Sequence, residues 1–198
     1  FGTDDITAIN EAAKAGALPA LAGAAVGFLV LAALLKTASF PLHGWLTEVM
    51  EAPTPVSALL HAGIINSGGF LLITFAWVVQ GSTASMAALV LLGGLTSLFG
   101  ALVMLTQSAV KTALAWSTVA QMGFMLLQCG LGLWPLALLH IVAHSLYKAH
   151  AFLSSGGAVA AVKEVRRPGA VATPGLAAVA RAFLLALALY AVVAVGFT

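Results

Sequence analysis

The chain has 198 residues, of which 62% are hydrophobic and only 7% are Asp, Glu, Lys or Arg. A soluble domain carries about 25% charged residues, so this composition excludes a soluble globular domain, and its hydrophobicity excludes disorder. The net charge of +2 comes without a basic patch, which argues against nucleic-acid binding. The single cysteine, Cys129, excludes a disulfide framework and a cysteine metal site.

Long segments without a charged residue run through the chain, over residues 15–35, 52–110 and 112–147. Charge-free apolar stretches of about 20 residues are typical of membrane-spanning helices. The sequence therefore predicts an all-α, polytopic transmembrane helix bundle with about six spans, forming a single membrane domain over residues 1–198. Because the segment begins in a polar stretch without Met and stops in an apolar one, we expect a fragment of a longer subunit.

Turn residues between the apolar runs set the expected boundaries. Pro41 interrupts the first span, which is therefore expected to be a broken helix followed by a short amphipathic piece. Thr54 followed by Pro55 is typical of a helix start and opens the second span. In chain order, the expected helices cover residues 18–39, 42–50, 55–79, 84–105, 108–131, 135–162 and 176–195.

The distribution of basic residues predicts the orientation in the membrane. Loops with an excess of Lys and Arg face the cytoplasm. We expect the loops after the first, third and fifth spans to be cytoplasmic and the N-terminus of the segment to face outward. The basic residues on the predicted cytoplasmic side are Lys111, Lys163, Arg166, Arg167 and Arg181.

Two histidines and a lysine recur at four-residue spacing in the fifth predicted span. His140, His144 and Lys148 lie on one helix face, each about 6 Å along the axis from the last. Imidazole titrates near neutral pH, and an amine held away from water can also gain and lose a proton. A charged group inside a membrane is costly and usually functional. This face therefore indicates a proton relay, and the alternative is packing with hydrogen-bonded histidines.

Three further ionisable residues lie within or beside the predicted spans. Lys36 and Lys111 are either relay groups or lysines whose side chains reach the membrane surface. His61 is either a relay group or a satisfied core histidine. Glu48 and Glu51 in the short amphipathic piece are expected on a solvated face, and we keep them as accessory residues.

Other chemistries fit the same residues less well. His140 and His144 have the spacing of zinc ligands, but the glutamate of an H-E-x-x-H motif and a third ligand are missing nearby. Haem held by two histidines requires facing helices at equal depth, and His61 matches neither of them in depth. We therefore expect neither a metal site nor a cofactor in this chain.

Several ordered strings of residues resemble one superfamily of membrane subunits. They are similar to the antiporter-like subunits of respiratory complex I and of the Mrp sodium/proton antiporters. The strings are KTASFPLHGWL at 36–46, EAPTPVSALLHA at 51–62, KTALAWSTVAQMGF at 111–124 and HIVAHSLYKAHAFLSSG at 140–156. Together they cover roughly residues 36–157 and are far more specific than any single motif above.

Within this superfamily the chain looks closest to the DabB branch, on the residues of 140–156, 63–70 and 125–130. The resemblance implies the membrane subunit of a bacterial complex that accumulates inorganic carbon. It implies a soluble zinc partner, DabA, similar to a β-carbonic anhydrase, and inward cation flow, of protons above all, that drives CO2 hydration. The chain itself would be a multi-pass transport subunit of the bacterial inner membrane, coupled to an enzyme.

The resemblance also implies roles for individual residues. Lys36 matches a lysine in a broken helix that pairs with a glutamate on an earlier helix, which would lie outside this chain. Lys111 matches a central lysine, and His61 matches a relay histidine. The face of His140, His144 and Lys148 matches a second helical relay.

Two departures from the superfamily pattern stand out. Thr47 replaces a usual proline, and the last span has no internal Lys or Glu that could serve as an exit group. Three alternatives to the DabB function stay open: a proton pump in a quinone oxidoreductase or membrane hydrogenase, a Mrp-type sodium/proton antiporter, and a non-conducting membrane scaffold.

Overall fold

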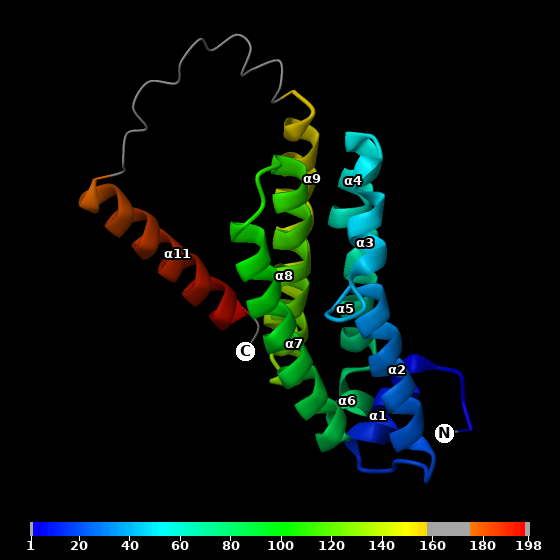
Figure 1. Ribbon diagram of the computed structural model, residues 1–198. Helices are drawn as coiled ribbons and strands as arrows, with labels where there is room; N and C mark the ends of the chain where they lie inside the picture. Colours follow the sequence, from blue (N-terminus) through cyan, green and yellow to red (C-terminus); the bar gives the residue numbers. More distant parts are fainter. Residues whose placement is uncertain (1, 158–174, 197–198) are drawn as a thin grey trace, which may run out of the picture. The chain divides into compact units, whose positions relative to one another are not determined.

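The computed structural model describes residues 2–157 and 175–196, and every regular element in these ranges is a helix (Figure 1). The chain divides into two compact units, residues 1–157 and 158–198, and each is described by itself. The predicted all-α fold is confirmed for the described residues, whereas the single domain stays a prediction.

In chain order the α-helices and 3-10 helices (η) are α1 (Ile6–Lys14), α2 (Ala22–Lys36), α3 (Gly44–Glu48), η1 (Val49–Glu51), α4 (Thr54–Ala62), η2 (Ile64–Asn66), α5 (Ser67–Thr74), α6 (Ala76–Gln80), α7 (Thr83–Leu105), α8 (Val110–Gly130), α9 (Trp134–Ser155) and α11 (Leu176–Gly196).

Three helical stretches among the described residues are long and apolar enough to cross a membrane. They are Thr54–Thr74, which comprises α4, η2 and α5, and the helices α7 and α9. The helix α2 and the stretch Leu176–Val192 of α11 are apolar but shorter. A membrane core about 30 Å thick needs about 20 helical residues, so each of the first three stretches is long enough to cross it. The number of six spans stays a prediction.

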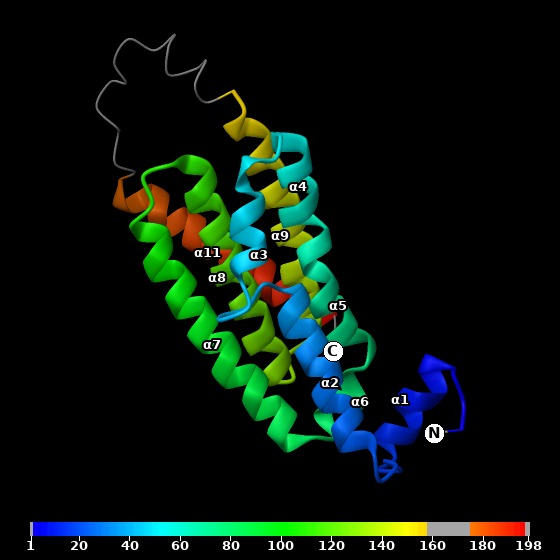
Figure 2. The same cartoon turned by 45° about the vertical axis from the view of Figure 1, so that its right-hand side comes forward.

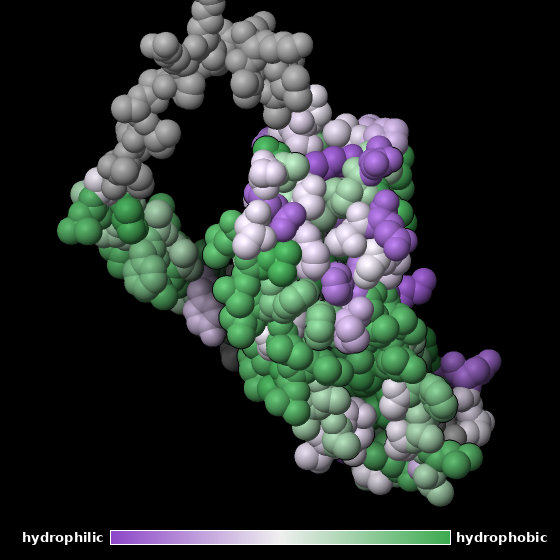
Figure 3. Space-filling model, viewed as in Figure 1, coloured by the Kyte–Doolittle hydropathy of each residue, from purple (hydrophilic) through white to green (hydrophobic). Residues whose placement is uncertain are grey.

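The outer surface of the first unit is apolar along its length. Large hydrophobic side chains on α7 are exposed, among them Leu91, Leu95, Leu98 and Leu102. The space-filling view shows hydrophobic side chains over α7 and α2, and hydrophilic ones gathered at the end where α3 and α4 lie (Figure 3). This arrangement is that of a bundle whose middle faces lipid or further helices and whose end faces water.

The predicted break in the first span is present, but the helix ends earlier than expected. The helix α2 ends at Lys36, and α3 begins only at Gly44. Hydroxyl groups satisfy the last carbonyls of α2: Thr37 Oγ1 donates to Ala33 O at 2.9 Å, and Ser39 Oγ donates to Leu34 O at 2.8 Å. Side chains that compete for backbone carbonyls favour a helix end, which explains why the helix stops before Pro41.

The second span was predicted as one helix over 55–79, and this prediction is wrong. The structure divides it into α4, η2, α5 and α6. The first break lies at Gly63, and the side chain of Asn66 donates to Ala62 O at 2.8 Å, so an amide replaces a backbone donor there. The second break lies at Phe75, and Asn10 Nδ2 donates to Thr74 O at 2.9 Å beside it.

The helix α1 was not predicted, because residues 6–14 are partly polar and the prediction relied on long apolar runs. Its start is defined by Asp5, whose side chain accepts a hydrogen bond from Thr7 N at 2.9 Å. It lies beside α6 at one end of the unit in both ribbon views (Figures 1 and 2). There Lys14 Nζ is 5.1 Å from the centre of a Trp77 ring, a cation–π distance. The helix therefore packs against the end of the broken span.

Glycines allow α7 and α8 to approach each other closely. A Cβ atom at Gly123 would lie 2.4 Å from Ser97 N, and one at Gly93 would lie 2.6 Å from Leu127 N. Small residues at such positions are what membrane helices use to bring their backbones together. Gly93 and Gly123 are therefore contact positions between the two helices, whereas Gly94 faces open space.

The last two predicted helices agree in part with the structure. The helix α9 ends at Ser155, and the remainder of its predicted range, from 158 to 162, lies outside the described residues. The predicted loop at 166–169 and its basic residues also lie outside them. The helix α11 agrees with the predicted range 176–195 within one residue.

Candidate functional site

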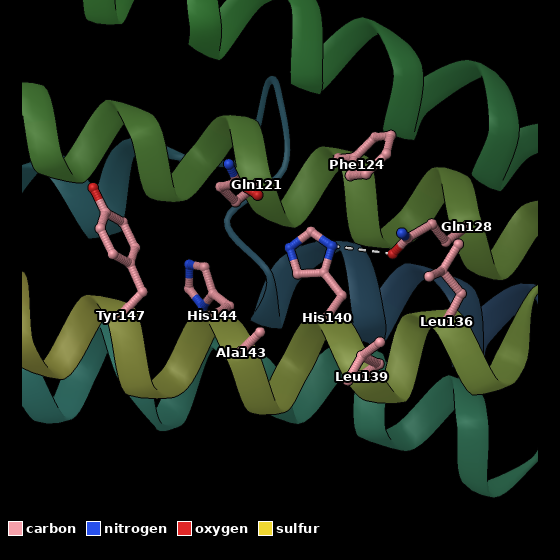
Figure 4. Close-up of a pocket in the computed structure, with 9 residues that line it drawn as sticks. All are labelled: Gln121, Phe124, Gln128, Leu136, Leu139, His140, Ala143, His144 and Tyr147. Atoms are coloured by element: carbon pink, nitrogen blue, oxygen red, sulfur yellow. Dashed lines mark hydrogen bonds between the residues drawn. The ribbon is translucent and has the colours of Figure 1, made fainter. Parts of the chain in front are cut away.

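The three residues predicted to form a relay on the fifth span, His140, His144 and Lys148, share one face of α9. His144 and Lys148 are buried, and His140 is half-buried. The rings of His140 and His144 have their centres 6.0 Å apart, and both point toward α8 (Figure 4). Four-residue spacing on a regular helix produces this alignment, as expected. A gap of this size is too long for a direct hydrogen bond but can be bridged by a water molecule.

Lys148 is fully buried in the first unit and has only neutral hydrogen-bond partners. Its Nζ donates to Leu114 O at 3.1 Å and to Ser117 Oγ, both on α8. The ammonium also lies 5.3 Å from the centre of the Tyr147 ring. An ammonium buried without a carboxylate is costly, so this position needs a reason beyond packing.

No carboxylate of the described residues can compensate Lys148 from inside the bundle, because all of them are exposed. These exposed acidic residues are Asp4, Asp5, Glu11, Glu48 and Glu51.

His61 joins the α9 face from the neighbouring helix. It is fully buried in the last turn of α4, and its ring stacks on Phe152 with 4.3 Å between ring centres and 21° between planes. Phe152 follows Lys148 by four residues on α9, so the stack places His61 one turn from the buried amine. Neither ring nitrogen of His61 has a hydrogen-bond partner among the described protein atoms, and the same is true of His144.

Lys111 lies at the start of α8 and reaches the connection before α4. It is the second residue of that helix, whereas the predicted helix began at residue 108 and placed it about one turn in. Its Nζ donates to Ala52 O, the carbonyl that follows η1. The structure therefore holds Lys111 at the same end of the bundle as the start of α4, the helix that carries His61.

The structure does not bring Lys36 or the accessory acids into this cluster. Lys36 is exposed at the last position of α2, and Glu48 and Glu51 are exposed on α3 and η1. Six residues were predicted for the relay, and the described part of the chain gathers His61, His140, His144 and Lys148 around α9, with Lys111 at the end of the same bundle.

Polar residues of α8 complete the site, and the sequence analysis missed them. Gln128 is buried, and its Oε1 lies 3.1 Å from His140 Nδ1. Ser117 binds Lys148, and Gln121 lies between Ser117 and Gln128 along the helix. Their helical spacing of four and seven residues puts all three on one face, which was the available signal. Neutral polar side chains cost less to bury in a membrane helix than charged ones, so they indicate a functional position less strongly.

A groove of about 390 Å³, open to the surface of the first unit, lies between α8 and α9 beside the two histidines (Figure 4). A water molecule occupies about 30 Å³ in the liquid, so this space holds several. Nε2 of His140 and both ring nitrogens of His144 lie buried beside this groove. The residues that line the groove are Gln121, Phe124, Gln128, Leu136, Leu139, His140, Ala143, His144 and Tyr147.

Among residues 2–157 and 175–196, no group of three or more His, Cys, Asp or Glu side chains is arranged to hold a metal ion. The site instead combines imidazoles, amines, hydroxyls and amides inside an apolar bundle. Its chemistry is that of proton exchange between groups that titrate or reorient.

The fold and the site define a polytopic membrane protein with ionisable groups buried between its helices. Residues 1–197 match the family described as NADH:quinone oxidoreductase/Mrp antiporter, TM, and the chain belongs to this family of transmembrane proteins. Family membership and geometry thus agree on an antiporter-like membrane subunit.

The chain is similar to two kinds of curated relatives and to one solved complex. It is 58% identical over 144 residues to the probable inorganic carbon transporter subunit DabB of Hydrogenovibrio crunogenus, covering 73% of this chain and 28% of that protein. It is 38% identical over 148 residues to NADH-ubiquinone oxidoreductase chain 5 of Chondrus crispus, covering 73% of this chain and 22% of that protein. The solved Mrp complex from Dietzia sp. DQ12-45-1b matches with a TM-score of 0.69 and 31% identity, over 81% of this chain and 18% of that one.

These comparisons confirm the resemblance stated from the sequence. The chain spans only 22% and 28% of the length of the two curated relatives. The activity and the partners of the whole subunit therefore belong to the proposal below.

Proposed function

We propose that this chain is part of the proton-conducting membrane subunit of a DabAB-like complex, in which inward proton flow drives CO2 hydration to bicarbonate. The observation that carries the proposal is Lys148, a fully buried amine with neutral partners on one helix face with His144 and His140. Such a residue inside a membrane protein usually serves ion movement. The similarity to a DabB subunit supports the choice of complex.

The proposed path runs along α9. Protons enter through Lys111 and His61, whose ring stacks one turn from Lys148, and pass to the buried amine. From Lys148 they continue to His144 and His140 through water in the groove between α8 and α9. Each group has to be able to take up and release a proton.

Lys36 serves as the entry gate in this proposal. Its exposure in the first unit fits an acidic partner supplied by the rest of the subunit, which biases the protonation of the amine. Glu48 on α3 and Glu51 on η1 are exposed, and they act as accessory residues that attract cations. The path selects protons because water and imidazole relay them, whereas a metal ion needs a cage of oxygen ligands.

The coupled chemistry takes place on a partner. No cofactor is needed in this chain, and a DabA-like soluble zinc protein hydrates CO2. The complex resides in the bacterial inner membrane, with the end that carries Lys111 on the cytoplasmic side and the N-terminus of the segment outward, as the positive-inside rule suggests.

Reconstitution tests the proposal. The full-length subunit, purified with its partner, is placed in liposomes that contain a pH-sensitive dye, and proton entry is measured after a pH jump. We expect His144→Ala to abolish most of the flux, and His150→Ala, an exposed histidine on the same helix, to leave it unchanged. Unchanged flux in an assembled His144→Ala complex would instead support a non-conducting scaffold.

A second candidate function is a proton-pumping subunit of a respiratory quinone oxidoreductase. The 38% identity to NADH-ubiquinone oxidoreductase chain 5 favours it, and the Mrp complex keeps sodium/proton antiport open. Co-purification separates these cases: zinc in the partner supports the DabAB-like complex, and flavin or iron–sulfur clusters support the respiratory one. Sodium-dependent flux would support antiport.

A further inference from the structure

We infer that Gln128 is a positioning residue that fixes the tautomer and the ring orientation of His140, and so directs one end of the relay. This inference rests on the proposed function. It starts from a contact between two helices: Gln128 Oε1 on α8 lies 3.1 Å from His140 Nδ1 on α9 (Figure 4). Gln128 is buried, so its amide cannot turn to bulk water for a partner.

The contact determines where the proton of the imidazole resides. The Gln128 amide turns its Oε1 toward His140, and a carbonyl oxygen only accepts hydrogen bonds, so we take Nδ1 of His140 as the protonated nitrogen. The other nitrogen, Nε2, is then the acceptor, and it is buried without a partner among the described protein atoms. Which nitrogen of a histidine is protonated follows from the hydrogen bond that the other one makes.

The free acceptor faces the relay. In the close-up, Nε2 lies on the side of His144 and Gln121, while Nδ1 is turned to Gln128 (Figure 4). A proton that arrives from His144 through water therefore meets an acceptor rather than a second N–H group. Without Gln128 the ring could present its N–H to the groove, and the transfer would need a preceding tautomer exchange.

Few polar side chains surround His140. The residues that share the groove with it are apolar or aromatic apart from Gln121, Gln128, His144 and Tyr147. The ring of Phe124 lies 5.7 Å from that of His140 and limits its rotation, but it offers no hydrogen-bond acceptor in the ring plane. Gln128 is the residue among these whose contact with His140 has hydrogen-bond geometry.

Nitrogen NMR of the imidazoles tests this inference on the full-length subunit with its partner. The protein is labelled with 15N-histidine and reconstituted in liposomes, and the signals of His140 are identified by their loss in His140→Gln. In the unaltered protein we expect Nδ1 protonated and Nε2 unprotonated. Gln128→Met keeps the unbranched shape but removes the amide, and we expect it to shift His140 toward the Nε2-protonated form and to reduce proton flux several-fold.

Two further variants make the result decisive. Gln128→Glu keeps an acceptor oxygen at this position, so it should retain the Nδ1-protonated form. Gln128→Leu gives the same expectation as Gln128→Met if the latter fails to assemble. Gln80→Met is the matched control, because Gln80 is an exposed amide whose Oε1 accepts from Trp134 Nε1 at 3.3 Å, away from the histidines.

The inference is overturned if Gln128→Met leaves the protonation of His140 unchanged, or if it changes the tautomer and leaves the flux intact. Failure of the proposed function looks different. In that case the His144→Ala complex conducts like the unaltered one, whatever the NMR signals of His140 show.

Discussion

Two lysines of this chain illustrate two ways in which a membrane subunit places an amine. Lys148 lies in the middle of α9, fully buried, with its hydrogen bonds made inside the first unit. Lys36 lies at the end of α2 beside a helix break and is exposed. The hydrogen-bond partners of Lys148 lie within the first unit, whereas the proposed function gives Lys36 a partner elsewhere in the subunit. The comparison teaches that the proposed relay can be examined within this unit, whereas the proposed entry gate requires the rest of the subunit.

Replacing the buried lysine should have the largest effect on transport. Lys148→Met removes the amine through which the proposed relay passes, and we expect proton flux to fall at least about a hundredfold, as when one acid–base group is lost. The thermal stability of the complex should stay the same or rise, because a buried charge is removed. Dye-based flux and a thermal melt of the same sample measure both.

A contrary result would be clear in that experiment. If Lys148→Met lowers stability and leaves the flux per assembled complex unchanged, the lysine has a packing role, and the difference between the two lysines has no functional meaning. Lys14→Met, an exposed lysine beside Trp77, serves as the control.

Replacing the exposed lysine should also lower the flux but leave the fold alone. Lys36→Ala removes the proposed gate, and we expect a large loss of flux with a change in unfolding free energy below about 0.5 kcal/mol, as for most surface sites. Flux and thermal melts again give the two numbers. A strong destabilisation would show that Lys36 has a buried partner in the whole subunit that contributes to folding.

Close packing of α7 and α8 should matter for assembly more than for transport. Gly123→Ala places a Cβ atom 2.4 Å from Ser97 N, and we expect a loss of about 1–3 kcal/mol, which is typical of overpacking. Gly94→Ala, at a position with open space, is the matched control and should be tolerated. Complex yield and melting temperature report the difference, and equal values for both variants would contradict the proposed packing.

The smallest effect is expected at the accessory acids. Glu48 and Glu51 are exposed, so their charges are screened by salt and reach the path only through their field. Replacing both with Gln should lower the flux by less than about twofold at physiological salt, and the difference should grow at low salt. An effect as large as that of Lys36→Ala would place these acids in the path itself.

The relay face was predictable because it depends on local geometry. His140, His144 and Lys148 follow one another at four-residue spacing, and the helix carries that spacing directly into a shared face. Their burial followed from the cost of exposing such groups to lipid. The apolar runs predicted α7 and α11 to within one residue at each end for the same local reason.

Other features depend on contacts between distant segments and were missed or wrong. The breaks at Gly63 and Phe75 divide a span that reads as one apolar run, because Asn66 and Asn10 bind carbonyls that a continuous helix would use. The contact of Gln128 with His140 could not be predicted from the sequence, because the two residues are twelve positions apart and meet only where α8 packs against α9. A polar side chain in an apolar run gives no indication of what it will face.

The central claim is that Lys148 itself gains and releases protons, and Lys148→Arg tests it most directly. Arginine keeps the positive charge but does not give up its proton in proteins, so charge and exchange are separated. In assembled full-length complexes the account predicts that proton flux is lost in Lys148→Arg as in Lys148→Met. Flux retained in Lys148→Arg would contradict it, because a fixed charge would then suffice at this position.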